Sequence, residues 1–116
     1  MPNARRVGHQ YERDVARELR ELLSDEKIKT SRYASKELDD NKVDISGTQK
    51  YGLNIQCKRY KNTPNLFEVI GSMPQDGDIN TIFWKKPNRG ELVIISKKDF
   101  YHIIKKLLAC QKKLNQ

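Results

Sequence analysis

The stretch Leu53-Asn54-Ile55-Gln56-Cys57-Lys58 has the alternation of a β-strand that is apolar on one side only. Because successive side chains of a strand point to opposite faces, its polar face is formed by Asn54, Gln56 and Lys58. Strands between helices are usually covered on both sides, so we expect this polar face to line a cleft or to meet water. Taken alone, the strand fits an exposed sheet face at least as well as a functional cleft.

Glu12 stands out because it lies on the apolar side of a predicted helix that runs from His9 to about Ser24. The apolar stripe of this helix consists of Val15, Ala16, Leu19, Leu22 and Leu23. On a helical wheel, Glu12 falls within that stripe, where an ionised carboxylate is costly unless a cation or hydrogen-bond donors meet it. A solvated position one turn from the helix start explains Glu12 alone equally well.

Asp44 lies between Val43 and Ile45 in a short apolar segment, and considered alone it is most simply a turn residue. The order of the polar residues adds information: an acid on a helix, an acid on a strand, a short turn, then a polar-x-Lys strand. Antiparallel neighbouring strands would bring Asp44 beside Gln56 and Lys58, with the helix acid above them. Two carboxylates and an amide oxygen are hard ligands of the kind that Mg²⁺ prefers.

The rest of the pattern predicts one α/β domain over residues 1–116, in the order helix, strands, helix, strands, helix. Apart from the elements above, we expect a strand at Lys27–Ala34, a polar loop at Ser35–Lys42, a helix that starts with Thr63 and Pro64, and strands at Ile79–Lys85 and Leu92–Ile95. Ser96 is the expected N-cap of the last helix. The residues of that helix expected to point inward are Phe100, Ile103, Ile104, Leu107 and Leu108.

Lysine and arginine (23) outnumber aspartate and glutamate (15), which gives a net charge of +8 and indicates a polyanionic partner, nucleic acid first and an anionic membrane second. No stretch is long and apolar enough to span a membrane, and residues 1–8 lack the apolar core of a signal peptide. We therefore expect an intracellular, cytoplasmic protein. Cys57 and Cys110 form no CxxC pair, so they are expected to be reduced, small and buried.

Together these residues resemble the PD-(D/E)xK nuclease superfamily, most closely its Holliday junction resolvases of the archaeal and phage type. The resemblance spans nearly the whole chain. Gly8-His9-Gln10-Tyr11-Glu12-Arg13 is similar to the N-terminal motif, Val43-Asp44 stands in place of Pro-Asp, and Gln56-Cys57-Lys58 in place of Glu-x-Lys. Ser31–Ser35 is similar to the segment that approaches the catalytic centre in these enzymes. Because Gln56 replaces a carboxylate, the site has one negative charge fewer and is expected to hold Mg²⁺ more weakly.

The resemblance implies a restriction-endonuclease-like core, with a central mixed β-sheet flanked by helices. It also implies Mg²⁺-dependent hydrolysis of DNA phosphodiesters, with Mn²⁺ as a substitute, at a site formed by Glu12, Asp44, Gln56 and Lys58. Metal ligands would be Glu12, Asp44, Gln56 and the backbone carbonyl of Cys57, and Lys58 would orient a water or stabilise the transition state. The compact size and motif suggest a phage or prophage origin, which would place the protein in the host cytoplasm.

Substrate binding is expected to depend on basic and polar residues that gather around the motif in sequence. The expected DNA-binding residues are Arg5, Arg6, Arg13, Lys29, Arg32, Ser35, Lys36, Arg59 and Lys61. They would contact phosphates and give binding that is strongly salt-dependent. A solvated surface charge explains any one of the basic residues as well, although not the whole set.

A four-way junction needs two symmetric incisions, so a resolvase is expected to be a homodimer. The candidate dimer surface is Phe67, Ile70 and Met73 with Phe83 and Trp84, although the core of the monomer is the better explanation for most of these residues. Two other functions stay open. One is a nuclease of the same superfamily that acts on flaps, nicks or restriction-type sites. The other is a non-catalytic DNA-binding module in which Gln56 marks lost activity.

Overall fold

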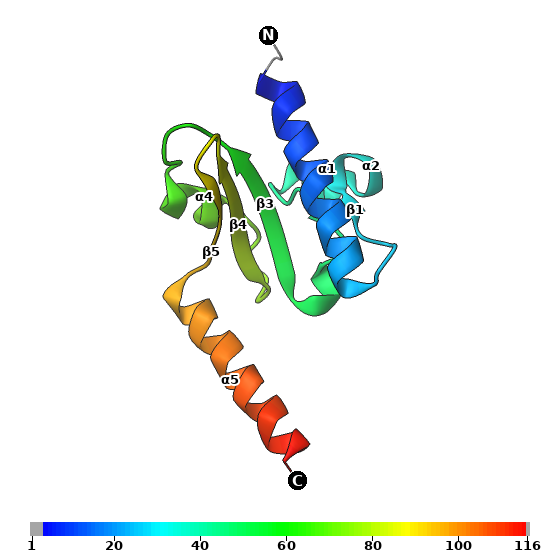
Figure 1. Cartoon of the computed structure of the whole chain (residues 1–116), viewed down its shortest axis with the longest axis vertical. Coiled ribbons are helices and arrows are strands. Elements are labelled where there is room, and N and C mark those ends of the chain that lie inside the picture. The colour runs from blue at the N-terminus through cyan, green and yellow to red at the C-terminus, as the bar shows by residue number, and fades with distance from the viewer. Residues whose placement is uncertain (1–3, 116) are drawn as a thin grey trace.

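The computed structural model describes residues 4–115, whose helices and strands are arranged as Figure 1 shows. The chain forms, in order, α1 (Ala4–Leu23), β1 (Lys29–Thr30), α2 (Ser31–Ala34), α3 (Lys36–Asp40), β2 (Ile45–Ser46), the 3₁₀ turn η1 (Gln49–Tyr51), β3 (Leu53–Arg59), α4 (Leu66–Ser72), β4 (Ile79–Lys86), β5 (Gly90–Ile94) and α5 (Lys97–Leu114). Among these residues, no helix is long and apolar enough to cross a membrane.

Strands β3, β4 and β5 form a mixed sheet in that order. Strand β3 is parallel to β4, with Ile55 opposite Thr81, and β4 is antiparallel to β5. Helix α4 lies between β3 and β4 in sequence and packs against β4, as a parallel connection requires. Strands β1 and β2 form a separate antiparallel pair. The prediction of an α/β fold with a mixed sheet packed against helices is confirmed.

The hydrophobic core lies between α1 and the apolar face of β3. Its fully buried members include Val15 of α1, Ile45 of β2 and Ile55 of β3, with Cys57 and Phe83 at its border. The period of the apolar residues in α1 thus matches the alternation in β3, which explains why these two elements pack together.

The other face of β3 is polar but largely closed to solvent. Asn54 is 1% exposed and Gln56 6%. The Asn54 amide donates to Asn80 Oδ1 of β4 at 3.2 Å, and Asn80 in turn donates to the Pro74 carbonyl at 2.8 Å. A buried polar side chain is tolerated when it has such partners. Asn54 therefore has a structural explanation, which separates it from Gln56.

Three local predictions were wrong. The segment Lys27–Ala34 is a strand only at its centre, because the chain turns into α2 once the Ser31 N–H donates to the Asp44 carbonyl at 2.8 Å. Ser35–Lys42 is not a loop, since the Ser35 hydroxyl accepts from the Leu38 N–H and caps α3. Helix α4 begins after Asn65, not Thr63, because the Asn65 side chain caps it.

The predictions for the C-terminal third were wrong in a different way. Strand β5 and helix α5 form close to where they were expected, and Ser96 caps α5 as predicted. Of the five α5 residues expected to point inward, four are exposed, among them Leu107 by 60% and Leu108 by 51%, and Ile103 is half-buried. Phe100 and Ile104 are exposed as well, and so is Cys110, which we expected to be buried. Helix α5 projects away from the sheet, so nothing within residues 4–115 covers its apolar side (Figure 1).

Candidate active site

The Glu12 carboxylate lies on the side of α1 that faces β3, as its position on the helical wheel predicts. Its side chain is only 14% exposed, and the guanidinium of Arg32 in α2 pairs with it at 3.2 Å, from Nε to Oε2. The Nη2 atom of Arg32 is buried with no hydrogen-bond partner among the described residues. Arg32 is therefore the cation that a carboxylate in this position requires, and it retains an unused donor.

Asp44 is held at the entry of β2 by the backbone of β3. Its N–H donates to the Ile55 carbonyl at 2.8 Å, and its Oδ2 accepts from the Cys57 N–H at 2.7 Å. The turn after β2 allows this approach: Gly47 has φ +98°, and a Cβ there would lie 3.0 Å from the Lys27 carbonyl oxygen. The Asp44 carboxylate is thus fixed by the strand that carries Gln56 and Lys58.

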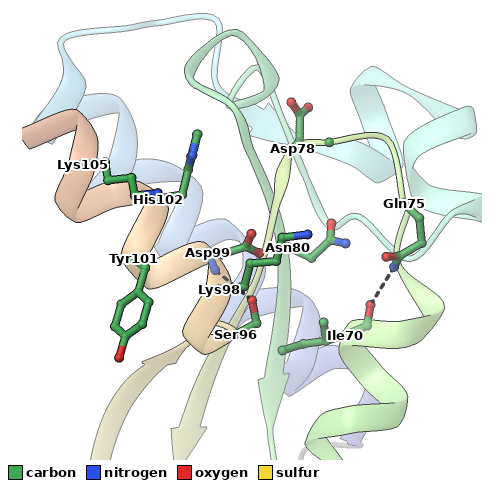
Figure 2. A pocket seen from close by; sticks show the side chains of 11 residues that line it. Ile70, Gln75, Asp78, Asn80, Ser96, Lys98, Asp99, Tyr101, His102 and Lys105 are labelled. Atoms are coloured by element: carbon green, nitrogen blue, oxygen red, sulfur yellow. Dashed lines mark hydrogen bonds between the residues drawn. The ribbon is translucent and has the colours of Figure 1, made fainter. Parts of the chain in front are cut away.

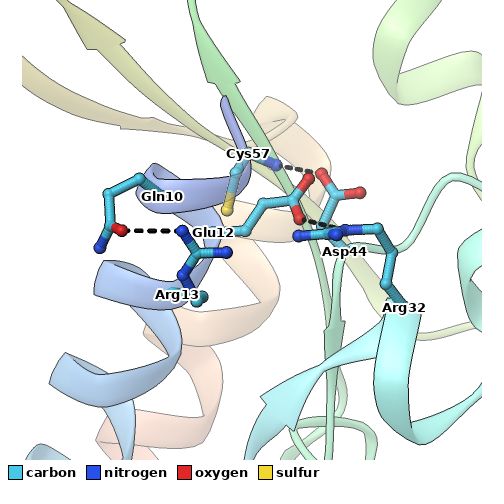
Figure 3. A network of polar contacts seen from close by, with 6 residues as sticks. All are labelled: Gln10, Glu12, Arg13, Arg32, Asp44 and Cys57. Carbon is cyan, nitrogen blue, oxygen red and sulfur yellow. Dashed lines mark hydrogen bonds and ion pairs between the residues drawn. The ribbon is translucent and has the colours of Figure 1, made fainter. Parts of the chain in front are cut away.

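The charges of the Glu12 and Asp44 carboxylates interact. Figure 3 shows the carboxylates of Glu12 and Asp44 pointing into the same space. Burial, followed by the negative charge of Glu12, raises the pKa of Asp44 to about 7, although the Cys57 N–H and the charge of Lys58 oppose this shift. A site in which two largely buried carboxylates lie close together is one that a cation would stabilise.

Gln56 and Lys58 follow on the same face of β3. The Gln56 side chain is buried, yet its Oε1 accepts no hydrogen bond from any described residue. The Lys58 ammonium binds neither carboxylate directly; it lies 3.5 Å from the Tyr60 hydroxyl and 5.5 Å from the centroid of that ring. The site therefore contains one unused oxygen acceptor and one cation with donors to spare.

Cys57 lies between these two residues but faces the core. Burial, followed by the charges of Asp44 and Glu12, raises the pKa of its thiol well above the usual range. The thiol therefore stays protonated at neutral pH and is not a nucleophile. Cys57 takes part through its backbone, whose N–H holds Asp44; the role of its carbonyl as a metal ligand stays a prediction.

All four predicted catalytic residues line one open cleft of about 860 Å³. Its walls come from α1, from the segment between α3 and β2, from β3 and from α4. Glu12, Asp44, Gln56 and Lys58, which are up to 46 positions apart in the sequence, thus border the same space. The volume of this cleft lies within the range of ligand-binding sites.

The predicted DNA-binding residues fall into separate groups. Arg5, Arg32 and Arg59 line the cleft. Arg13 and Lys29 border a different hollow beside α1 and β1, and Arg13 donates to Gln10 Oε1 at 2.8 Å (Figure 3). The remaining four lie outside both groups: Ser35 caps α3, and Arg6, Lys36 and Lys61 are exposed. Three of the nine predicted DNA-binding residues thus line the same cleft as the four predicted catalytic residues.

Sequence reasoning missed two basic residues of the cleft, His9 and Lys42. His9 precedes Glu12 by three residues, so the helical period alone places it on the same side of α1. No sequence pattern indicated Lys42. Its position at the cleft depends on its own backbone conformation, with φ +64°, just after the end of α3.

The donor set fits a hard divalent cation. Its side-chain oxygens are two carboxylates and the unpartnered Gln56 Oε1, which are the ligand types that Mg²⁺ and Mn²⁺ accept. No group of three or more His, Cys, Asp and Glu side chains that could hold a metal occurs within residues 4–115.

Comparisons with protein-family models, with curated proteins and with solved structures found no match to this chain.

Proposed function

We propose that this protein is a metal-dependent endonuclease of the PD-(D/E)xK type that cuts branched DNA, with Glu12, Asp44, Gln56 and Lys58 as its active site. The observation that carries the proposal is the pair of neighbouring carboxylates, Glu12 and Asp44, in one open cleft, beside a buried amide oxygen that has no partner among the described residues. A buried polar group with a structural role has hydrogen-bond partners within the protein. A buried polar group that binds a ligand has a donor or acceptor that the protein leaves unpaired.

The fold supports the same proposal. In a restriction-endonuclease-like core, a helix acid and two strand motifs meet at one edge of a mixed sheet, as α1, the Asp44 segment and β3 do here. Asp44 is bound to β3 through two backbone hydrogen bonds, which keeps the two motifs in register. The β3–β4 parallel pair with its helical connection fits that core as well.

Glu12, Asp44 and Gln56 would hold Mg²⁺, or Mn²⁺ in its place, with Arg32 keeping the Glu12 carboxylate in position. When bound, the metal would supply positive charge and lower the pKa of a water. Lys58 donates to a phosphate oxygen and stabilises the negative charge that develops there. Arg5 and Arg59, at the border of the cleft, bind neighbouring phosphates.

The test is cleavage of an immobile four-way junction with and without Mg²⁺. Asp44→Asn, Glu12→Gln and Lys58→Ala are each expected to reduce the cleavage rate by about 10²-fold or more. Matched controls are Glu21→Gln on the exposed side of α1 and Lys86→Ala at the end of β4, which should cleave at the wild-type rate. Full activity of the Asp44 or Lys58 variant would contradict the proposal.

A panel of junction, flap, nicked and linear DNAs distinguishes junction resolution from the other nuclease activities. A resolvase would cut the junction in two symmetric positions and would act as a homodimer. The non-catalytic alternative is favoured by one observation, the amide at position 56. It predicts DNA binding that weakens steeply with salt, without cleavage and without a response to Mg²⁺ or Mn²⁺.

A further inference from the structure

A small hollow lies beside the active-site cleft, between α1 and the β1–α2 segment. Its volume is about 250 Å³, and the residues that line it are Arg13, Ala16, Arg20, Lys29, Thr30 and Tyr33. Arg13 and Arg20 are about two turns apart on the same side of α1, and Ala16, which is 1% exposed, lies between them. A small side chain between two long ones leaves an indentation on a helix, which explains why the hollow forms here.

All the charged residues that line this hollow are cations. They are Arg13, Arg20 and Lys29, and none of the acids among residues 4–115 lines it. The cleft of about 650 Å³ at the base of α5 differs, because acids and cations line it together: Asp78 and Asp99 with Lys98, His102 and Lys105 (Figure 2). Opposite charges offset each other there, whereas the hollow beside α1 attracts an anion such as a phosphate.

The cations of the hollow keep donors for such an anion. Arg13 donates to Gln10 Oε1 at 2.8 Å, and Arg20 donates to the Ile28 carbonyl at 2.9 Å. Each bond holds a guanidinium in place and leaves most of its five donors unused. Lys29 is exposed and forms no ion pair with a described acid. The hollow therefore offers positioned donors for phosphate oxygens.

Tyr33 adds an aromatic surface to this basic hollow. Its side chain is 78% exposed, and the Arg32 guanidinium lies over its ring, 5.7 Å from the centroid. A single exposed tyrosine is normal on a protein surface. An exposed ring that borders a hollow with three cations is, however, the combination that binds a nucleotide, because the ring stacks with a base while the cations bind the phosphate.

The hollow and the active-site cleft share a border. Arg13 directly follows Glu12 on α1, and Tyr33 directly follows Arg32, whose guanidinium pairs with Glu12 at 3.2 Å. Figure 3 shows Arg13 beside Glu12 on α1 and Arg32 reaching Glu12 from α2. Because consecutive Cα atoms are only about 3.8 Å apart, a nucleotide in the hollow would be a near neighbour of the phosphate in the cleft.

We infer that this hollow binds one unpaired nucleotide next to the branch point of the DNA, with its base on Tyr33 and its phosphate on Arg13 and Lys29. Inside a duplex, a base is paired and stacked on both sides, so it reaches Tyr33 only at the energetic cost of leaving the stack. That cost is lower at a branch, and the hollow therefore selects branched over linear DNA. The inference rests on the proposed function for the identity of the substrate, but the binding that it predicts does not require cleavage.

Binding in metal-free buffer tests the hollow separately from catalysis. We expect the wild type to bind an immobile four-way junction more tightly than a linear duplex of the same length. Tyr33→Ala should lower the affinity for the junction about tenfold, as the loss of one base–aromatic stack does, and the affinity for the duplex by less than about twofold. Tyr33→Phe keeps the ring and should bind both DNAs as the wild type does.

The matched control is Tyr101→Ala. Tyr101 is also exposed, by 52%, and also has a cation over its ring, Lys97, but it lies on α5. This variant should leave both affinities unchanged. A wild type without a preference for the junction, or a Tyr33→Ala variant that keeps the preference, would overturn the inference. A preference that depends on Tyr33 in a protein that does not cleave would support the hollow and contradict the nuclease.

Junctions that lack single bases identify the bound nucleotide directly. Abasic sites are placed one at a time at the positions next to the branch. At one of them, the missing base should weaken binding by the wild type about tenfold and binding by Tyr33→Ala less than about twofold, because both changes remove the same stack. Independent effects of the two changes at every position would overturn the inference.

The salt dependence of junction binding tests the phosphate contacts. The double variant Arg13→Gln/Lys29→Gln removes two cations from the hollow, so the slope of log affinity against log salt should become less steep by about 1.4–1.8. Lys112→Gln/Lys113→Gln on α5 makes the same change in net charge and should leave the slope unchanged. Equal slopes for the two double variants would contradict the contacts of Arg13 and Lys29.

Discussion

Helices α1 and α5 are both long, both amphipathic and both rich in basic residues, but only α1 is packed. Helix α1 buries Tyr11, Val15 and Ala16 against β3, whereas no residue of α5 is buried. An apolar stripe therefore shows that a helix needs a packing partner, but it does not show where that partner lies. Helix α1 packs against β3 of the same chain. These two elements also position Glu12 and Asp44, which the hydrophobic core does not require.

The largest expected effect is on stability, and it separates the two helices. Ile55→Ala removes a fully buried side chain under α1 and should lower the free energy of unfolding by about 2–5 kcal/mol. Leu107→Ala on α5, which changes a side chain that is 60% exposed, should alter the free energy of unfolding by less than about 0.5 kcal/mol in the same urea unfolding experiment. Equal effects would mean that α5 is packed in the monomer after all.

The second prediction concerns the cost of the acids next to α1. The pKa of Asp44 is raised from 3.8 to about 7, so the unfolded chain releases this proton first and folding stability falls as the pH rises from about 4 to about 7. Asp44→Asn lacks this loss. In metal-free buffer, the free energy of unfolding of the variant minus that of the wild type should be roughly 1–3 kcal/mol larger above pH 7 than below pH 4. Thermal unfolding of both proteins across this pH range measures the difference in stability. A difference that is independent of pH would contradict the raised pKa of Asp44.

Gln56→Glu sharpens the comparison by restoring a third carboxylate on the α1 side. The added charge should strengthen Mg²⁺ binding about tenfold, or about 1.4 kcal/mol, and should lower the melting temperature of the metal-free protein. The readout is the increase in melting temperature on addition of Mg²⁺. Gln75→Glu, in the cleft at the base of α5, is the control and should leave the response to Mg²⁺ unchanged. If Gln56→Glu responded no better than this control, position 56 would not be a metal ligand.

The smallest effect is expected at the dimer surface that the sequence analysis named. Of its residues, Met73 and Trp84 are buried and Phe83 borders the core, so the monomer explains them. Phe67 is exposed, and Phe67→Ser should change the free energy of unfolding by no more than about 0.5 kcal/mol. Urea unfolding and the molar mass should both match the wild type; a lower molar mass for the variant would show that Phe67 lies in a dimer interface.

Much of the fold could be predicted where local pattern and final environment agree. Strands β3 and β4, the part of α1 from His9 onward and the Ser96 cap depend on alternation, helical period and a side chain close in sequence, whereas the pattern did not predict the helix over residues 4–8. The strand expected at Lys27–Ala34 failed because a long-range hydrogen bond, from Ser31 to Asp44, ends it. In the same way, the cleft includes the predicted Glu12, but no local pattern indicates its ion pair with Arg32, which the sequence predicts only as a DNA-binding residue.

By itself, the sequence determined which side chains are unusual for their positions: an acid within an apolar helix stripe, and an amide and a lysine on one strand face. These follow from the short periods of helix and strand, which any local stretch expresses. Only the tertiary structure decided that these residues border one cleft, that burial and the charge of Glu12 raise the pKa of Asp44, and that α5 projects uncovered. Burial and charge coupling depend on distances between residues far apart in the chain, and no local period encodes those distances.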